Sequence, residues 1–147
     1  MKIYEIKDNK KDYIDLLLLA DEQEDMIDRY LERGKMFVLD DGGIAAECVV
    51  TDEGGGVLEI KNIAVNPAHQ NMGYGKRLID FISEKYNRSH SVLQVGTGDS
   101  PLTVPFYKKC GFEFSHTVPN FFIDNYDHPI IECGIQLKDM IYFKKNL

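Results

Sequence analysis

The fold is decided by seven residues, Gln70-Asn71-Met72-Gly73-Tyr74-Gly75-Lys76. They follow an apolar run at 60–65 that is typical of a buried strand. They lead into residues 76–86, where apolar side chains recur at helical spacing. The sequence therefore predicts a strand, a short turn with two glycines, and a helix.

Such a turn can bind an anion. Glycine permits a positive φ and lets a ligand approach the backbone, and the first turn of a helix carries unpaired N–H groups at the positive end of its dipole. Together these features predict a cradle for a group such as a pyrophosphate. Taken alone the signal is weak, because Gly73 and Gly75 lack the third glycine of the dinucleotide fingerprint and the P-loop pattern is absent.

Length and composition favour one domain spanning residues 1–147. Hydrophobic residues make up 44% and charged residues 28%, as in ordinary globular proteins. We see no repeats or linker, no apolar stretch long enough for a membrane span, and no signal-peptide core at the N-terminus. The three cysteines and four histidines show no metal-ligand spacing. We therefore expect a cytoplasmic protein with reduced thiols and no metal.

The net charge of −7 is unevenly distributed. Residues 1–60 carry 16 Asp and Glu against 7 Lys and Arg, whereas residues 61–147 carry 8 against 10. An acidic surface argues against nonspecific binding to nucleic acid, which needs a basic footprint. The division suggests that a cationic ligand approaches the first half and an anionic ligand the second. The alternative is that 21–32 is simply the solvated face of a helix.

Hydrophobic periodicity and turn signals predict the remaining elements. Strands are expected at 3–6, 35–40, 44–51, 57–65, 91–96, 112–118 and 139–144, and helices at 12–19, 21–33, 73–86 and 104–110. The aromatic segment 119–134 is expected to be an irregular loop, either lining a pocket or packed in the core. Hairpins with one βαβ crossover predict an α+β fold with a mixed, mostly antiparallel sheet of six or seven strands and flanking helices.

Two motifs in a defined order point to a family. The stretch 59–67 runs into Gln70-x-x-Gly73-x-Gly75, and residues 106–112 follow as Phe-Tyr-Lys-Lys-Cys-Gly-Phe. This arrangement resembles the GNAT superfamily of N-acetyltransferases, whose most diagnostic segments are a strand followed by [RQ]-x-x-G-x-[GA] and a later helix ending F/L-Y-x-x-x-G-F. The resemblance is specific from 58 to 112 and architectural elsewhere.

The resemblance implies a site for acetyl-CoA. Its pantetheine arm would enter between the strands at 57–65 and 91–96 and pair with the backbone of Ile63, Ala64 and Val65. One of these N–H groups would polarise the thioester carbonyl. The pyrophosphate would lie on the N–H groups from Asn71 to Lys76, in the loop that Gln70 opens. Ser100 stands where the family often has an asparagine that contacts CoA, and its shorter side chain can still cap a helix.

The resemblance also implies two catalytic residues. Glu59 matches an acidic residue that several members use as a base, directly or through water, and Tyr107 matches the general acid beside the CoA sulfur. The alternatives are that Glu59 only faces polar neighbours and that Tyr107 is only a packed aromatic. Pro105 requires the helix at 104–110 to begin late or to be distorted.

The sequence thus predicts an acetyl-CoA-dependent N-acetyltransferase that acts on a primary amine by direct attack. The alternative is a noncatalytic acyl-CoA-binding or sensing domain of the same fold. The acceptor is a small-molecule or peptide amine that the sequence does not identify. No nucleic acid or membrane partner is expected, and a homodimer is an expectation from the family alone.

Overall fold

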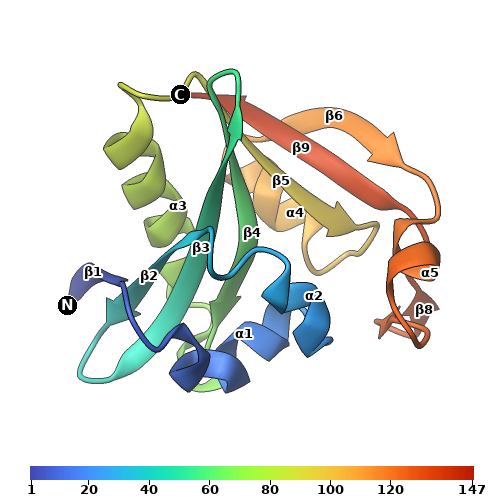
Figure 1. Ribbon diagram of the computed structural model, residues 1–147, viewed down its shortest axis with the longest axis horizontal. Helices are drawn as coiled ribbons and strands as arrows, with labels where there is room; N and C mark the ends of the chain where they lie inside the picture. Colours follow the sequence, from blue (N-terminus) through green and yellow to red (C-terminus); the bar gives the residue numbers. More distant parts are fainter.

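A single large sheet organises the chain, and the computed structural model describes residues 1–147 (Figure 1). Its strands are β1 (Lys2–Ile6), β2 (Lys35–Asp40), β3 (Ile44–Gly54), β4 (Val57–Val65), β5 (Val92–Gly98), β6 (Glu113–Val118) and β9 (Met140–Asn146). The strand order is β1-β2-β3-β4-β5-β9-β6, and only β4 and β5 run parallel. The predicted mixed, mostly antiparallel sheet is confirmed.

Helices cover both faces of this sheet. They are α1 (Ile14–Ala20), α2 (Glu24–Asp28), α3 (Tyr74–Tyr86), α4 (Val104–Lys109) and α5 (Phe121–Asn125), with the 3₁₀ helices η1 (Lys10–Tyr13) and η2 (Pro67–His69). Alternation along β2 shows how the two cores form, because successive side chains of a strand point to opposite faces. Phe37 and Leu39 join α3 and α4 in the larger core, whereas Met36 and Val38 pack with α1 and α2 in the smaller one. No helix is both long and apolar enough to cross a membrane.

Two predicted segments differ from the structure. The expected helix at 21–33 is wrong beyond α2, because residues 29–33 form turns. These turns still bury Tyr30 and Leu31, so the apolar spacing does not separate turns from a continuous helix. The expected loop at 119–134 holds α5 and the start of a small hairpin, β7 (Ile131–Glu132) and β8 (Ile135–Gln136). This segment is ordered by an apolar cluster of its own, Phe122, Ile130 and Leu137.

The two parallel strands separate along their length. β4 and β5 pair only from Val57↔Val92 to Ile60↔Val95. Beyond that point β4 continues to Val65 and β5 to Gly98 without pairing to each other. The register of β3 against β4 shifts at Lys61, where the separation begins. One end of the sheet centre is therefore open.

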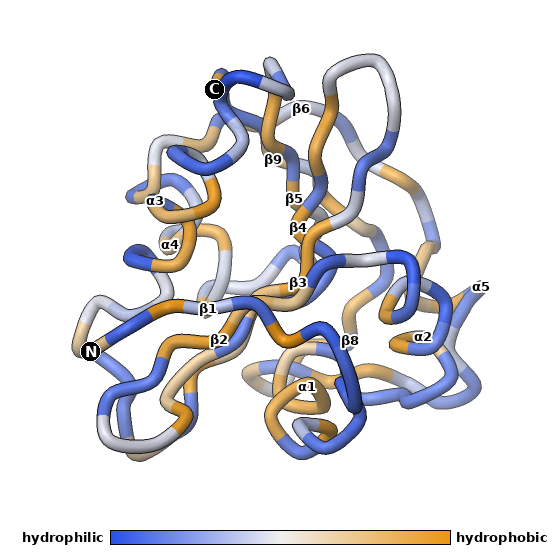
Figure 2. The backbone as a smooth tube through the Cα atoms, turned by 60° about the vertical axis from the view of Figure 1, so that its left-hand side comes forward, coloured by the Kyte–Doolittle hydropathy of each residue, from blue (hydrophilic) through white to orange (hydrophobic).

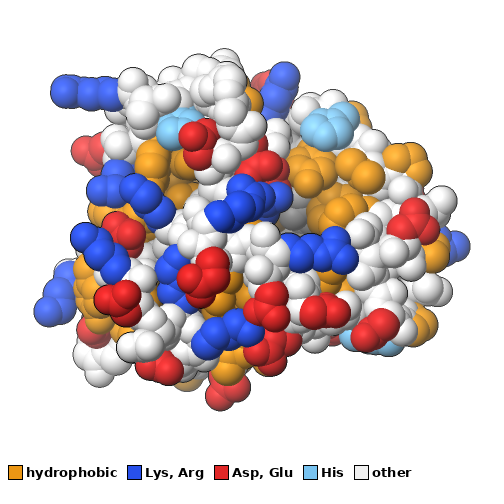
Figure 3. Space-filling view, in the orientation of Figure 1, with side chains coloured by type: hydrophobic (Ala, Val, Ile, Leu, Met, Phe, Trp, Pro, Cys, Tyr) orange, Lys and Arg blue, Asp and Glu red, His pale blue; other side chains and the backbone are white.

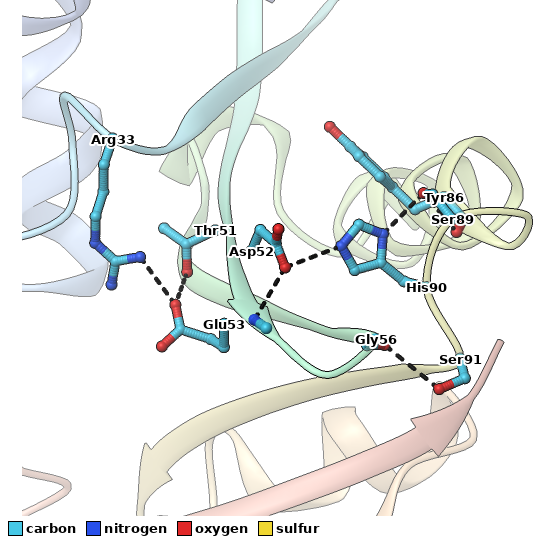
Figure 4. Close-up of polar contacts among 10 residues, drawn as sticks. Arg33, Thr51, Asp52, Glu53, Gly56, Tyr86, Ser89, His90 and Ser91 are labelled. Atoms are coloured by element: carbon cyan, nitrogen blue, oxygen red, sulfur yellow. Dashed lines mark hydrogen bonds and ion pairs between the residues drawn. The ribbon is translucent and has the colours of Figure 1, made fainter.

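The opposite end of this strand pair is tied to its neighbours (Figure 4). The Asp52 carboxylate accepts a hydrogen bond from the Gly54 N–H at 3.0 Å and lies 3.3 Å from Nε2 of His90. The Ser91 N–H donates to the Gly56 carbonyl at 2.8 Å. These contacts join the β3–β4 turn to the loop before β5, so the strands are fastened where they meet and free where they diverge.

Candidate active site

A cavity of about 270 Å³ lies at the separated ends of β4 and β5. Its walls come from the α1–α2 connection, residues 60–63 of β4, residues 95–98 of β5, Tyr107 of α4 and the segment 119–140. In Figure 3 the surface is hollowed right of the centre, with apolar side chains beside the hollow and acidic side chains over α1 and α2 below it. The cavity has both an apolar wall and a charged rim.

Tyr107 reaches this cavity from α4. The helix begins at Val104, so Pro105 lies in its first turn, where proline is tolerated, and α4 is not broken. The Tyr107 ring packs edge-on against Phe106 and Phe112, while its hydroxyl forms no hydrogen bond within the protein. Burial raises the pKa of Tyr107 above its ordinary value. The hydroxyl is therefore protonated at neutral pH, as a general acid must be.

The loop before α3 has the features of an anion cradle. Gly73 occupies the N-cap position with φ of +79°, and no side chain caps this end of the helix. A Cβ at Gly73 would meet no atom within 4 Å, so the residue is needed for its backbone angle and leaves open space above the helix. At Gly75, by contrast, a Cβ would lie 3.0 Å from the Phe106 ring. The two glycines therefore serve different needs, a ligand-facing turn and the packing of α3 on α4.

Side chains hold the rest of this loop in place. Gln70 lies at its start and donates weakly to the Val65 carbonyl at 3.4 Å, and the Tyr74 hydroxyl donates to Asp41 in the β2–β3 turn. Lys76 is exposed and pairs with Asp80 one turn further along α3. Asn71 and Met72 are exposed, and Asn71 has φ of +63°. The loop is therefore fixed from both sides, and no side chain occupies the N-terminal end of α3.

The sequence matches a family model over the same elements. The model described as an acetyltransferase (GNAT) domain matches residues 32–114, more than half of the chain. The chain belongs to the GNAT family of N-acetyltransferases. The matched residues include β4, the loop before α3 and Tyr107, which form the cradle and part of the cavity wall. The walls from residues 19–22 and 122–140 lie outside the match.

Known acetyltransferases resemble this GNAT protein over nearly their whole length. An uncharacterized N-acetyltransferase of Bacillus subtilis, YvbK, is 38% identical over 130 residues, which cover 86% of this chain and 84% of that protein. An IAA acetyltransferase from Bacillus cereus is 35% identical with a TM-score of 0.91, covering 99% of both chains. A GNAT family acetyltransferase from Elizabethkingia anophelis, solved with acetyl-CoA bound, is 36% identical with a TM-score of 0.91, covering 99% of this chain and 97% of that one. These likenesses show an acetyltransferase and give no support to the noncatalytic alternative.

Glu59 does not line the cavity of the acetyltransferase. It lies on the paired part of β4 and is only 5% exposed. Its Oε1 accepts a hydrogen bond from Gln94 at 2.6 Å, and its Oε2 pairs with the Lys61 ammonium at 2.6 Å. Lys61 does line the cavity, so the predicted base is connected to the cavity through this ion pair. Its role as a base stays a prediction.

Of the other predicted positions, some line the cavity or its open strand edge and one does not. Ile63 lines the cavity, and Ala64 and Val65 follow it beyond the last β4–β5 pair, where the side of β4 that faced β5 has no strand partner. Ser100 is buried and does not line the cavity. Its Oγ accepts from the Leu102 N–H at 3.2 Å, which stabilises the turn before α4. The helix capping expected of Ser100 is not found, because the N-cap of α4 is Thr103 and no side chain caps that helix. The contact of Ser100 with CoA stays a prediction.

Sequence reasoning missed a buried carboxyl group, Glu47 on β3. It is fully buried opposite Ala64, and neither oxygen forms a hydrogen bond of ordinary geometry. Burial raises the pKa of Glu47 well above its ordinary value, and the nearby backbone N–H of Ala64 offsets this effect only in part. The presence of a single charged residue in the apolar run 44–50 was the sequence signal that could have identified Glu47 as a buried carboxyl.

Replacing Glu47 by Gln is expected to stabilise the fold, by an amount that grows with pH. Below its unfolded pKa of about 4.3 the carboxyl is protonated in both the folded and the unfolded state, so it does not oppose folding. As pH rises from there toward the higher pKa of the folded state, the free energy of unfolding falls by up to about 1.4 kcal/mol per pH unit. Gln has the same volume and cannot ionise. Thermal midpoints of both proteins from pH 5 to 8 would test this, and a difference independent of pH would contradict it.

Proposed function

We propose that this acetyltransferase transfers the acetyl group of acetyl-CoA directly to a primary amine. One observation carries the proposal: the parallel strands β4 and β5 separate beside a cavity that Tyr107 lines. The cradle at the start of α3 supports it, because uncapped N–H groups and the open space at Gly73 fit a pyrophosphate.

The open edge of β4 would hold the cosubstrate. Acetyl-CoA supplies an acetyl group activated as a thioester. The backbone of Ile63, Ala64 and Val65 would pair with the pantetheine arm as an additional strand would, because these residues lack a partner in β5. An N–H of this segment would stabilise the negative charge that develops on the carbonyl oxygen during attack.

Two proton transfers are needed, and the site offers a group for each. The Tyr107 hydroxyl would give its proton to the departing sulfur, since it is protonated and has no competing hydrogen bond. The attacking amine must first lose a proton, and Glu59 would accept it through water, or the Lys61 ammonium would give a proton to Glu59 and then take one from the amine. The acidic rim would concentrate a cationic amine at the cavity.

The direct test is a turnover assay with a panel of amines. Thiol release from acetyl-CoA should depend on an added primary amine and yield its acetylated product. The panel should contain short alkyl amines, diamines, amino acids and a peptide with a free N-terminus. Binding of acetyl-CoA without release of thiol for any amine would contradict the proposal.

Replacing Glu59 by Gln should lower the rate most at neutral pH and less at alkaline pH. The base is needed while the amine is protonated, and free amine is abundant at high pH. The measurement is kcat/KM against pH for one good acceptor. Glu113→Gln is the matched control, because Glu113 is an exposed strand residue on β6 outside the cavity lining. An unchanged pH profile in the Glu59 variant would assign Glu59 to strand packing alone.

A further inference from the structure

The wall of the cavity holds one carboxylate in a fixed orientation. Asp21, at the end of α1, accepts a hydrogen bond from the Tyr30 hydroxyl at 3.0 Å on Oδ2 and from the Tyr126 hydroxyl at 2.7 Å on Oδ1. Burial raises the pKa of Asp21, but both hydroxyl donors and the backbone N–H of Gln23 favour its ionised form. A carboxylate accepts about four hydrogen bonds, so Asp21 keeps a lone pair for another donor. Asp21 is therefore an oriented anion that lines the cavity.

The other charged groups of the lining are also mostly acidic. Glu22 and Glu132 line the cavity with Asp21, and the only cation among the lining residues is Lys61, which pairs with Glu59. His128 lies 3.1 Å from Glu22 at the exposed rim, outside the lining. The lining thus carries negative charge that no protein cation neutralises at Asp21 or Glu132.

A second, independent observation concerns Asn62 on β4. This residue is 3% exposed and lines the cavity. Its Nδ2 donates to the Leu17 carbonyl at 3.0 Å and to the Tyr30 hydroxyl at 3.1 Å, which fixes the amide orientation because a carbonyl only accepts. Its Oδ1 is left buried with no donor. A buried acceptor without a partner is unfavourable, so the cavity lacks a hydrogen-bond donor at this point.

We propose that Asp21 binds a second cationic group of the acceptor, so that the substrate is an α,ω-diamine or a short polyamine. The inference rests on the proposed function, which places the reacting amine beside Tyr107. The distal ammonium would donate to Asp21, and a bound ammonium or its water would supply the donor that Asn62 lacks. The carbon chain between the amines would lie against Phe122, Ile130 and Leu137, which form the apolar wall.

The test compares acceptors that differ only at the far end. The probes are 1,4-diaminobutane, butylamine and 4-aminobutanoate, whose ends are cationic, neutral and anionic. For the unmodified enzyme we expect kcat/KM to be highest for the diamine and lowest for the amino acid. Hydrogen bonds to charged groups are among the stronger ones, so the diamine should exceed the monoamine by about ten- to a hundredfold.

Variants assign this preference to the carboxylate. Asp21→Asn should remove most of the diamine preference, because KM should rise far more for the diamine than for butylamine. Glu132→Gln should lower the diamine preference less than Asp21→Asn does. The Glu132 side chain has no hydrogen bond to the protein, so this second variant serves if Asp21→Asn does not fold. Asp124→Asn is the matched control, because Asp124 is exposed on α5 outside the cavity.

Binding without turnover separates this inference from the proposed function. Calorimetry of 1,4-diaminobutane with CoA-saturated enzyme should show binding that Asp21→Asn weakens at least tenfold. Equal use of diamine and monoamine, or an unchanged preference in both variants, would overturn the role of Asp21 while leaving acetyl transfer intact. If no amine is acetylated, the proposed function fails and this inference fails with it.

Discussion

Replacing Gly73 by Asp is expected to abolish binding of acetyl-CoA while leaving the fold intact. The Gly73 φ of +79° adds some strain for any side chain, but Asp is one of the few residues other than glycine that adopt this region, and a Cβ there meets no protein atom within 4 Å. The new carboxylate would occupy the place proposed for the pyrophosphate and repel it. CoA at about 100 times its Kd stabilises a native protein by about 2.7 kcal/mol, which is a shift of several degrees in thermal midpoint. That shift should be present in the unmodified protein, with or without EDTA, and absent in the variant.

Gly54→Asp is the matched control for this experiment. Gly54 has φ of +83° and an equally unobstructed Cβ position, but it lies in the β3–β4 turn, away from α3. This variant should keep the full CoA-induced shift. A retained shift in Gly73→Asp would show that the pyrophosphate does not lie at the α3 N-terminus, and no shift in the unmodified protein would remove acetyl-CoA as the cosubstrate.

Replacing Tyr107 by Phe is expected to lower kcat by about 10²- to 10⁴-fold and to change CoA binding little. A general acid contributes on that order because its proton is needed only when the thiolate leaves. The ring contacts with Phe106, Phe112 and Phe143 are kept, and the lost hydroxyl has no hydrogen bond in the protein. Single-turnover rates and the Kd of acetyl-CoA would separate the two effects.

The control for this variant is Tyr86→Phe. The Tyr86 hydroxyl is also without a hydrogen-bond partner and belongs to α3, but it lies outside the cavity. Its removal should leave kcat unchanged. If Tyr107→Phe turns over a substrate at the unmodified rate while chemistry limits that rate, Tyr107 is a packed aromatic and another proton donor must be sought.

Local signals were sufficient for much of the fold. The strands at 35–40 and 57–65 were predicted with the bounds that β2 and β4 have. Glycines flank the first strand on both sides, and a glycine turn and Pro67 flank the second. The helix at 21–33 was overextended because Tyr30 and Leu31 are buried by turns as well as by a helix. The regular structure within 119–134 depends on packing against Leu137, which lies outside that segment. The sequence of the segment alone therefore did not predict it.

In the candidate site too, features built from neighbouring residues could be predicted, whereas contacts between distant residues could not. The cradle from Gln70 to Lys76 is a contiguous turn and helix start, so its residues could be predicted together. The contact of Asp21 with Tyr126 joins residues 105 positions apart and has no local signal. The ion pair of Glu59 with Lys61 could be guessed from spacing, but the hydrogen bond from Gln94 depends on the register of β4 against β5.

The position of β9 has a consequence for how the chain matures on the ribosome. β9 is synthesised after β5 and β6, yet it lies between them and pairs with both, with Tyr142 opposite Gly96 on one side and His116 on the other (Figure 2). A nascent chain that has released everything before residue 140 therefore has β5 with an open edge and β6 with no neighbour in the sheet. Open edges promote association with other chains, and domains form as their residues emerge. The half of the sheet on which Tyr107 of α4 packs can close only after translation has passed β9, and stalled chains that lack β9 should be captured by chaperones.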